Sequence, residues 1–127
     1  MKFKAPMEYE RHEKRIFCQA QSIRVRNESA TQIINNLCFH YHVKCPSITF
    51  EGWKSGCANH SYIKLPNVPS LRITLHELAH YMHQGGYFNE ELGGTELKET
   101  GSWHHGLHFQ LVLRKLHNYC EQYNYFI

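Results

Sequence analysis

Residues 70–84 read SLRITLHELAHYMHQ, and the interpretation of the whole chain starts from this stretch. Its apolar residues recur at spacings of four and three, which predicts a helix with one buried stripe. The residues of this stripe are Leu71, Leu75, Leu78 and Met82. Pro69 or Ser70 is placed to begin the helix, and Gly85 with Gly86 is placed to end it. We therefore expect a helix over 70–84 that packs one face into the core.

The same helix carries a metal-binding pattern. His76 and His80 are four residues apart, so both imidazoles lie on one helix face, one turn from each other. At that spacing both rings can reach a single ion at about 2.0–2.1 Å, the usual zinc–nitrogen bond length. Glu77 follows the first histidine, where its carboxylate can approach a metal-bound water without binding the metal. This HExxH pattern is typical of zinc metalloproteases and predicts Zn²⁺ on His76 and His80, with Glu77 as general base.

A catalytic zinc needs a third protein ligand and one open position. The candidates along the chain are His83, Glu96, Glu99, His104, His105 and His108. A last helix is predicted from about Ser102 to Tyr123, and its apolar stripe has His105 at its head. The stripe continues through Phe109, Val112, Leu116 and Tyr119 or Cys120. Because such a stripe faces inward, this pattern favours His105, while His104, His108, Glu96 and Glu99 stay open as alternatives.

The remaining segments predict a small α+β domain. Ser29 can cap a helix that runs to about Tyr41, with an apolar face of Ile33, Ile34, Leu37 and Cys38. Alternation favours a strand over 47–53 and a second strand over 57–65, paired as a hairpin or meander. We therefore expect a short antiparallel sheet of two to four strands that covers the helix at 70–84.

We expect residues 1–127 to form a single domain. We expect residues 1–10 to form a loose end. Residues 85–102, rich in glycine and glutamate, should form a long loop beside the site.

Composition narrows the classes of chemistry. The chain has 127 residues, 42% of them hydrophobic, and all 11 acidic residues are glutamates. Mechanisms built on an aspartate dyad or a Ser-His-Asp triad are therefore excluded within this chain. No apolar run approaches the roughly 20 residues of a membrane span, and the first residues lack a secretory pattern. We expect an intracellular, cytoplasmic protein with no membrane partner.

Charge gives little support for a nucleic-acid partner. The net charge is only +3, and glutamates at 10 and 13 dilute the mildly basic stretch of Arg11, Lys14, Arg15, Arg24 and Arg26. We interpret this stretch as a solvated face, and nucleic-acid binding as the weaker alternative.

The five cysteines include no C-x-x-C pair, and their number is odd. This usage is typical of reduced thiols in an intracellular protein. The alternative is a second metal site built from Cys38, Cys45 and Cys57, although spacings of 7 and 12 residues match no common zinc ribbon or finger.

Two stretches resemble a known family. LHELAH at 75–80 and WHHGLHF at 103–109 resemble the SprT/Spartan-like zincins, and look closest to small metallopeptidases of actinobacteria and their phages. Those proteins carry H-E-L-A-H followed by H-G-x-x-F, whose histidine is the third zinc ligand and corresponds to His105 here. The resemblance implies a zincin-like fold and zinc on His76, His80 and His105. It also implies that the substrate is a peptide or a protein. If the protein is encoded by a phage, it would act inside the host cell.

Other functions fit the same residues. The HExxH pattern also suits a zinc-binding regulatory or nucleic-acid-associated module whose zincin site is vestigial, or a hydrolase of a non-peptide substrate. A peptidase needs a second donor for the developing oxyanion, for which Tyr62, Tyr81, Tyr87 and His108 are the open candidates.

Overall fold

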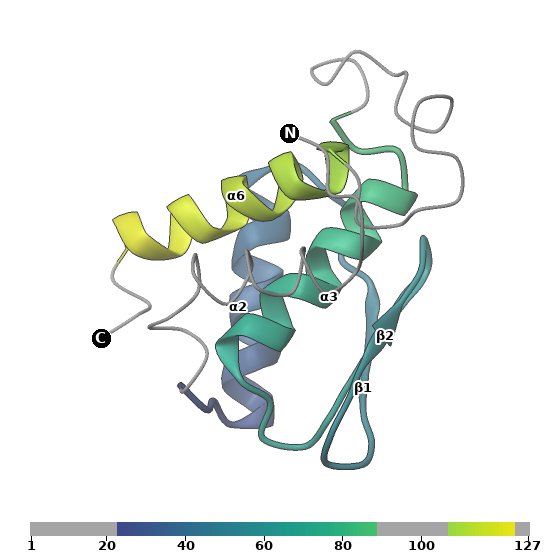
Figure 1. Ribbon diagram of the computed structural model, residues 1–127, viewed down its shortest axis with the longest axis vertical. Helices are drawn as coiled ribbons and strands as arrows, with labels where there is room; N and C mark the ends of the chain where they lie inside the picture. Colours follow the sequence, from purple (N-terminus) through teal and green to yellow (C-terminus); the bar gives the residue numbers. More distant parts are fainter. Residues whose placement is uncertain (1–22, 89–106, 124–127) are drawn as a thin grey trace.

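The computed structural model describes residues 23–88 and 107–123 as a small α+β arrangement (Figure 1). The elements along the chain are α2 (Asn27–His40), β1 (Ser47–Phe50), β2 (Cys57–Ala58), β3 (Tyr62–Leu65), α3 (Leu71–Gln84) and α6 (Leu107–Gln122). Helices α2 and α6 and the sheet all contact α3, so α3 is the central element. Across these two described ranges, no helix is long and apolar enough to cross a membrane.

Helix α3 confirms the prediction for residues 70–84. It begins after Ser70, whose hydroxyl accepts a hydrogen bond from the Ile73 amide at 3.1 Å and so satisfies one donor of the first turn. The helix ends at Gly85 and Gly86, and Gly86 has a φ of +79°, a left-handed conformation that suits glycine. The predicted stripe of Leu71, Leu75, Leu78 and Met82 is fully buried.

Helix α2 confirms the predicted apolar face but not the predicted cap. Its buried residues are Ala30, Ile33, Ile34, Leu37 and Cys38. The helix already begins at Asn27, so Ser29 lies inside its first turn and the expectation of a Ser29 cap was wrong. The start is held from outside the helix, because the Asn27 side chain accepts from the Val68 amide at 2.8 Å and donates to Asn67 at 3.2 Å.

The sheet differs from the expected antiparallel one. Its strand order is β1-β3-β2, with β2 and β3 antiparallel but β1 and β3 parallel. Residues 57–65 form two strands, because the chain reverses at Asn59, whose side chain accepts from the amides of Ser61 at 2.8 Å and Tyr62 at 3.1 Å. This second reversal returns the chain to the direction of β1. Strand β3 therefore lies between its neighbours as the centre of a mixed sheet.

The core joins all layers. Ile63 and Leu65 of β3 are fully buried on the sheet face toward α3. In α6 the predicted stripe is buried at Phe109, Val112, Leu116 and Cys120. The start of the expected last helix at Ser102, most of the expected loop over 85–102, and the expected loose end over 1–10 lie outside the described residues.

Candidate metal centre

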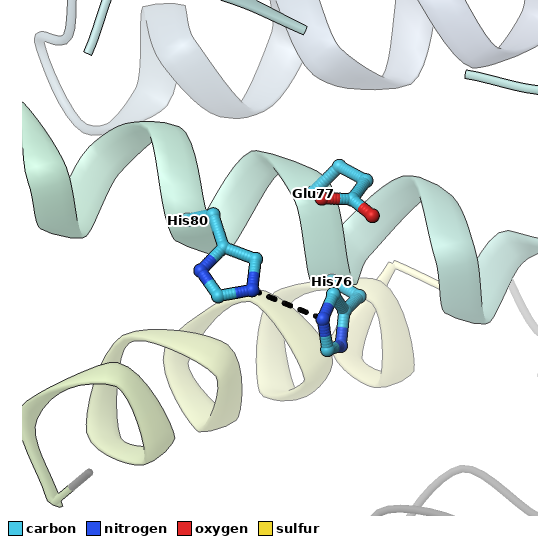
Figure 2. A group of neighbouring side chains, drawn as sticks. All are labelled: His76, Glu77 and His80. Carbon is cyan, nitrogen blue, oxygen red and sulfur yellow. Dashed lines mark hydrogen bonds between the residues drawn. The ribbon is translucent and has the colours of Figure 1, made fainter. Parts of the chain in front are cut away.

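The two histidines of α3 lie together, as their spacing predicts. The Nε2 atoms of His76 and His80 are 3.1 Å apart, and the ring planes meet at 72° (Figure 2). A ligand atom of each histidine and a carboxylate oxygen of Glu77 all lie within 4.8 Å of one another. Among the side chains that the structure describes, in residues 23–88 and 109–123, this is the only group of three close enough to hold one ion.

The distance between the two Nε2 atoms suits a tetrahedral zinc ion. Two nitrogen ligands at about 2.0–2.1 Å from a tetrahedral ion lie about 3.3–3.4 Å from each other. The observed 3.1 Å separation needs a change of only a few tenths of an ångström to reach that value. The donor set fits zinc as well, because imidazole nitrogens are among its preferred ligands.

Burial distinguishes this group from an ordinary polar helix face. Glu77 and His80 each keep only 8% of their surface exposed, and His76 is half-buried. Burying a carboxylate and an imidazole costs free energy unless both find polar partners or an ion. A buried acid and base in one cluster is therefore the arrangement expected of a functional site.

Helix α6 packs against the two histidines. The Phe109 ring stacks on His80 with centroids 4.3 Å apart and a 26° angle, and it meets His76 edge-on at 5.3 Å. Figure 2 shows both imidazoles on the side of α3 that faces α6. Because Phe109 is fully buried, it restricts the rotamers of both rings and holds their nitrogens in place. The sequence placed Phe109 in the apolar stripe but gave no indication of this contact.

A pocket of about 420 Å³ opens beside the group. Helix α3 contributes one wall, and strand β2 with the residue before it contributes the other. The lining residues are Gly56, Cys57, Ala58, His76, Glu77, His80 and Gln84. The sequence patterns did not indicate Gly56, Ala58 or Gln84 as lining residues, although Gln84 lies one helical turn beyond His80 on the same face and could have been found from that spacing.

The predicted third ligand cannot be placed on this structure. His105, His104, Glu96 and Glu99 lie outside the described residues, and so does the side chain of His108. His83 is described, and it is not part of the group formed by His76, Glu77 and His80. The choice of His105 therefore stays a prediction.

Two of the tyrosines considered as oxyanion donors make hydrogen bonds elsewhere. Tyr81 is buried and its hydroxyl donates to the carbonyl of Lys44, and the Tyr87 hydroxyl accepts from the Lys44 amide at 3.4 Å. Neither these two nor Tyr62 lines the pocket. In the described lining, Gln84 is the residue that offers a neutral amide N–H donor.

The cysteines do not form a second metal site within the described ranges. Cys38, Cys45, Cys57 and Cys120 are free, and the candidate group of three described ligands contains none of them. Burial and the neighbouring Cys45 thiol raise the pKa of Cys38 to about 12, and burial raises the pKa of Cys120 to about 12. Both buried residues therefore stay protonated at neutral pH and behave as small apolar side chains.

No protein-family model, curated protein or solved structure matches this chain.

Proposed function

We propose that this protein is a zinc-dependent metallopeptidase that hydrolyses peptide bonds, with Glu77 as general base and acid. His76 and His80 supply two zinc ligands, and His105 supplies the third on the basis of its sequence position and the resemblance to zincins. The observation that carries the proposal is the cluster in which the Nε2 atoms of His76 and His80 are 3.1 Å apart beside the buried Glu77 carboxylate.

The chain's own groups can perform the proton transfers that hydrolysis needs. When bound, zinc acidifies a water molecule and polarises a carbonyl oxygen. Glu77 lies next to the two ligands in the same pocket, so its carboxylate can accept the proton of the attacking water. The same carboxyl group then gives that proton to the leaving amine. Gln84 at the pocket wall offers an N–H to the substrate carbonyl.

The strand wall supports a peptide as substrate. Among the described strands, β2 pairs only with β3, so no described strand pairs with its other backbone edge, and its residues line the pocket. Such an edge offers N–H and C=O groups to an extended chain, a common way to bind peptides in a fixed register. A peptide added along β2 would lie beside the pocket that Glu77 also lines.

The test is Glu77→Gln at matched zinc occupancy. The amide keeps the size of the side chain but cannot accept the water proton, so we expect a fall in kcat of about 10²–10⁴-fold with zinc retained. Glu51→Gln is the matched control, because Glu51 is an exposed glutamate that pairs with Lys64 at 3.4 Å and does not line the pocket. Peptide-library cleavage followed by mass spectrometry provides the readout.

Each outcome separates this proposal from its alternative. Cleavage that survives in Glu77→Gln as in the wild type would rule out the peptidase mechanism. A zinc-loaded wild type that cleaves no member of the library would favour the regulatory or nucleic-acid-associated module with a vestigial site. The salt dependence of DNA binding would then test the nucleic-acid role.

A further inference from the structure

We propose that Gly56 is a positioning residue: its missing side chain leaves the space that Glu77 fills, and so fixes where the carboxylate lies in the pocket. This inference deepens the proposed function and rests on it for its catalytic consequence. The packing relation between the two residues is independent of any activity.

The strand wall and the helix wall lie close together at this point. A Cβ atom on residue 56 would lie 3.3 Å from Cγ and 3.4 Å from Oε2 of Glu77, and 2.5 Å from the carbonyl oxygen of Lys64. The first two distances put any side chain at this position against the Glu77 side chain. The third is shorter than real Cβ contacts, so the backbone at residue 56 or that of β3 would have to move as well.

Backbone conformation does not explain the glycine. Gly52 and Gly86 have positive φ values, which other residues adopt at a cost, but Gly56 is not among the positive-φ glycines. An alanine at 56 could therefore take the same backbone angles. Space, and not φ, is what the glycine provides at this position.

Ala58, the next residue of the strand wall that faces α3, is also small. Ala58 pairs with Ile63 of β3 and so faces α3, and a Cβ on residue 56 would meet Glu77 of α3 as well. Both positions carry the smallest side chains available. Strand β2 can therefore lie close to α3, and the Glu77 carboxylate is confined between the strand and the two histidines.

The experiment compares Gly56→Ala with Gly85→Ala. A Cβ on residue 85 would also meet close neighbours, the Tyr87 ring at 2.9 Å and the Tyr81 carbonyl at 3.1 Å, and it lies outside the pocket lining. Since a misplacement of about 1 Å can cost roughly 10²-fold in rate, we expect Gly56→Ala to lower kcat by about 10- to 100-fold. Zinc affinity and KM should stay near the wild-type values, and Gly85→Ala should keep kcat.

A second measurement needs neither zinc nor activity. In the metal-free protein, we expect Gly56→Ala to lower Tm less in a Glu77→Ala background than in the wild type, because part of the clash is gone. If Gly56→Ala alone fails to fold, folding of the double variant supports the proposal. Equal losses of Tm in the two backgrounds, or failure of both variants to fold, would assign the whole effect to Lys64 and overturn it.

The two measurements distinguish a failure of the proposed function from a failure of the positioning role. A wild type without peptidase activity would contradict the proposed function, while the Tm comparison would still decide whether Gly56 positions Glu77. A peptidase in which Gly56→Ala and Gly85→Ala have the same kcat would overturn the positioning role and leave the proposed function intact.

Discussion

The two walls of the pocket are built by opposite means. The wall formed by α3 acts through side chains that are present, namely His76, Glu77 and His80, with Phe109 packed beneath them. The wall formed by β2 acts through side chains that are small or missing, at Gly56 and Ala58. The helix therefore supplies the chemical groups, while the strand supplies the space in which they are held.

The largest expected effect is on the helix wall. Replacing His76 or His80 by alanine would remove a ligand of the proposed zinc site, so zinc affinity should fall by more than the roughly 10- to 100-fold typical of losing an outer-shell partner. If His105 is the third ligand, His105→Ala should lower zinc affinity to the same extent, while His83→Ala and His104→Ala should keep zinc. Metal analysis after gel filtration and competition with a chelator measure all five variants.

The same variants can also contradict the assignment of the ligands to α3. If His105→Ala binds zinc normally and His104→Ala does not, the third ligand is assigned wrongly although the pair on α3 stands. If His76→Ala and His80→Ala both keep zinc, α3 is not a metal-binding wall at all. The proposed peptidase would then lose its basis.

The helix wall could be predicted from the sequence because its features are local. The positions of His76, Glu77 and His80 follow from helical periodicity, and Ser70 and the two glycines mark where the helix begins and ends. The contact with Phe109 joins residues far apart in the chain, so periodicity showed only that Phe109 is buried. Which surface of α3 it covers depends on how two helices cross.

The strand wall could not be predicted in the same way. Residues 52–56 contain two glycines in a turn-rich stretch, and a glycine there has several ordinary explanations. The parallel pairing of β1 and β3 depends on a reversal at Asn59, which an Asn-His-Ser sequence at 59–61 signals only weakly. Small residues facing a neighbouring helix become visible only once the strands are in register.

The next largest effect concerns the support beneath the histidines. Phe109→Leu keeps an apolar core residue but removes the ring that stacks on His80, so we expect about 1–2 kcal/mol of lost stability from the incomplete filling of the site. Zinc affinity should fall by up to about 10-fold, as for an outer-shell change. Urea unfolding of the metal-free protein and chelator competition measure the two effects separately.

Phe39→Leu is the control for Phe109→Leu, since Phe39 is 85% exposed and lies on α2. It should change neither stability nor zinc binding. A Phe109→Leu variant that loses stability but keeps full zinc affinity would show that the ring contacts are packing alone. The helix wall would then hold its ligands without help from α6.

The smallest expected effect is at Cys57, the one residue of the strand wall with a metal-binding side chain. Cys57 pairs with Lys64 of β3, and directly opposed residues share a sheet face, so its thiol lies on the face away from α3. It is exposed, and it is not in the group formed by the two histidines and Glu77. Its place in the pocket lining therefore reflects its position on the strand and not a ligand role.

We accordingly expect Cys57→Ser to leave zinc affinity and kcat within about threefold of the wild type, since exposed substitutions away from buried features have small effects. Cobalt substitution sharpens the test, because a thiolate ligand adds an intense sulfur-to-metal absorption band that nitrogen ligands lack. The wild-type cobalt protein should show no such band. A band that disappears in Cys57→Ser would mean that β2 contributes a ligand, and the strand wall would then supply chemistry as well as space.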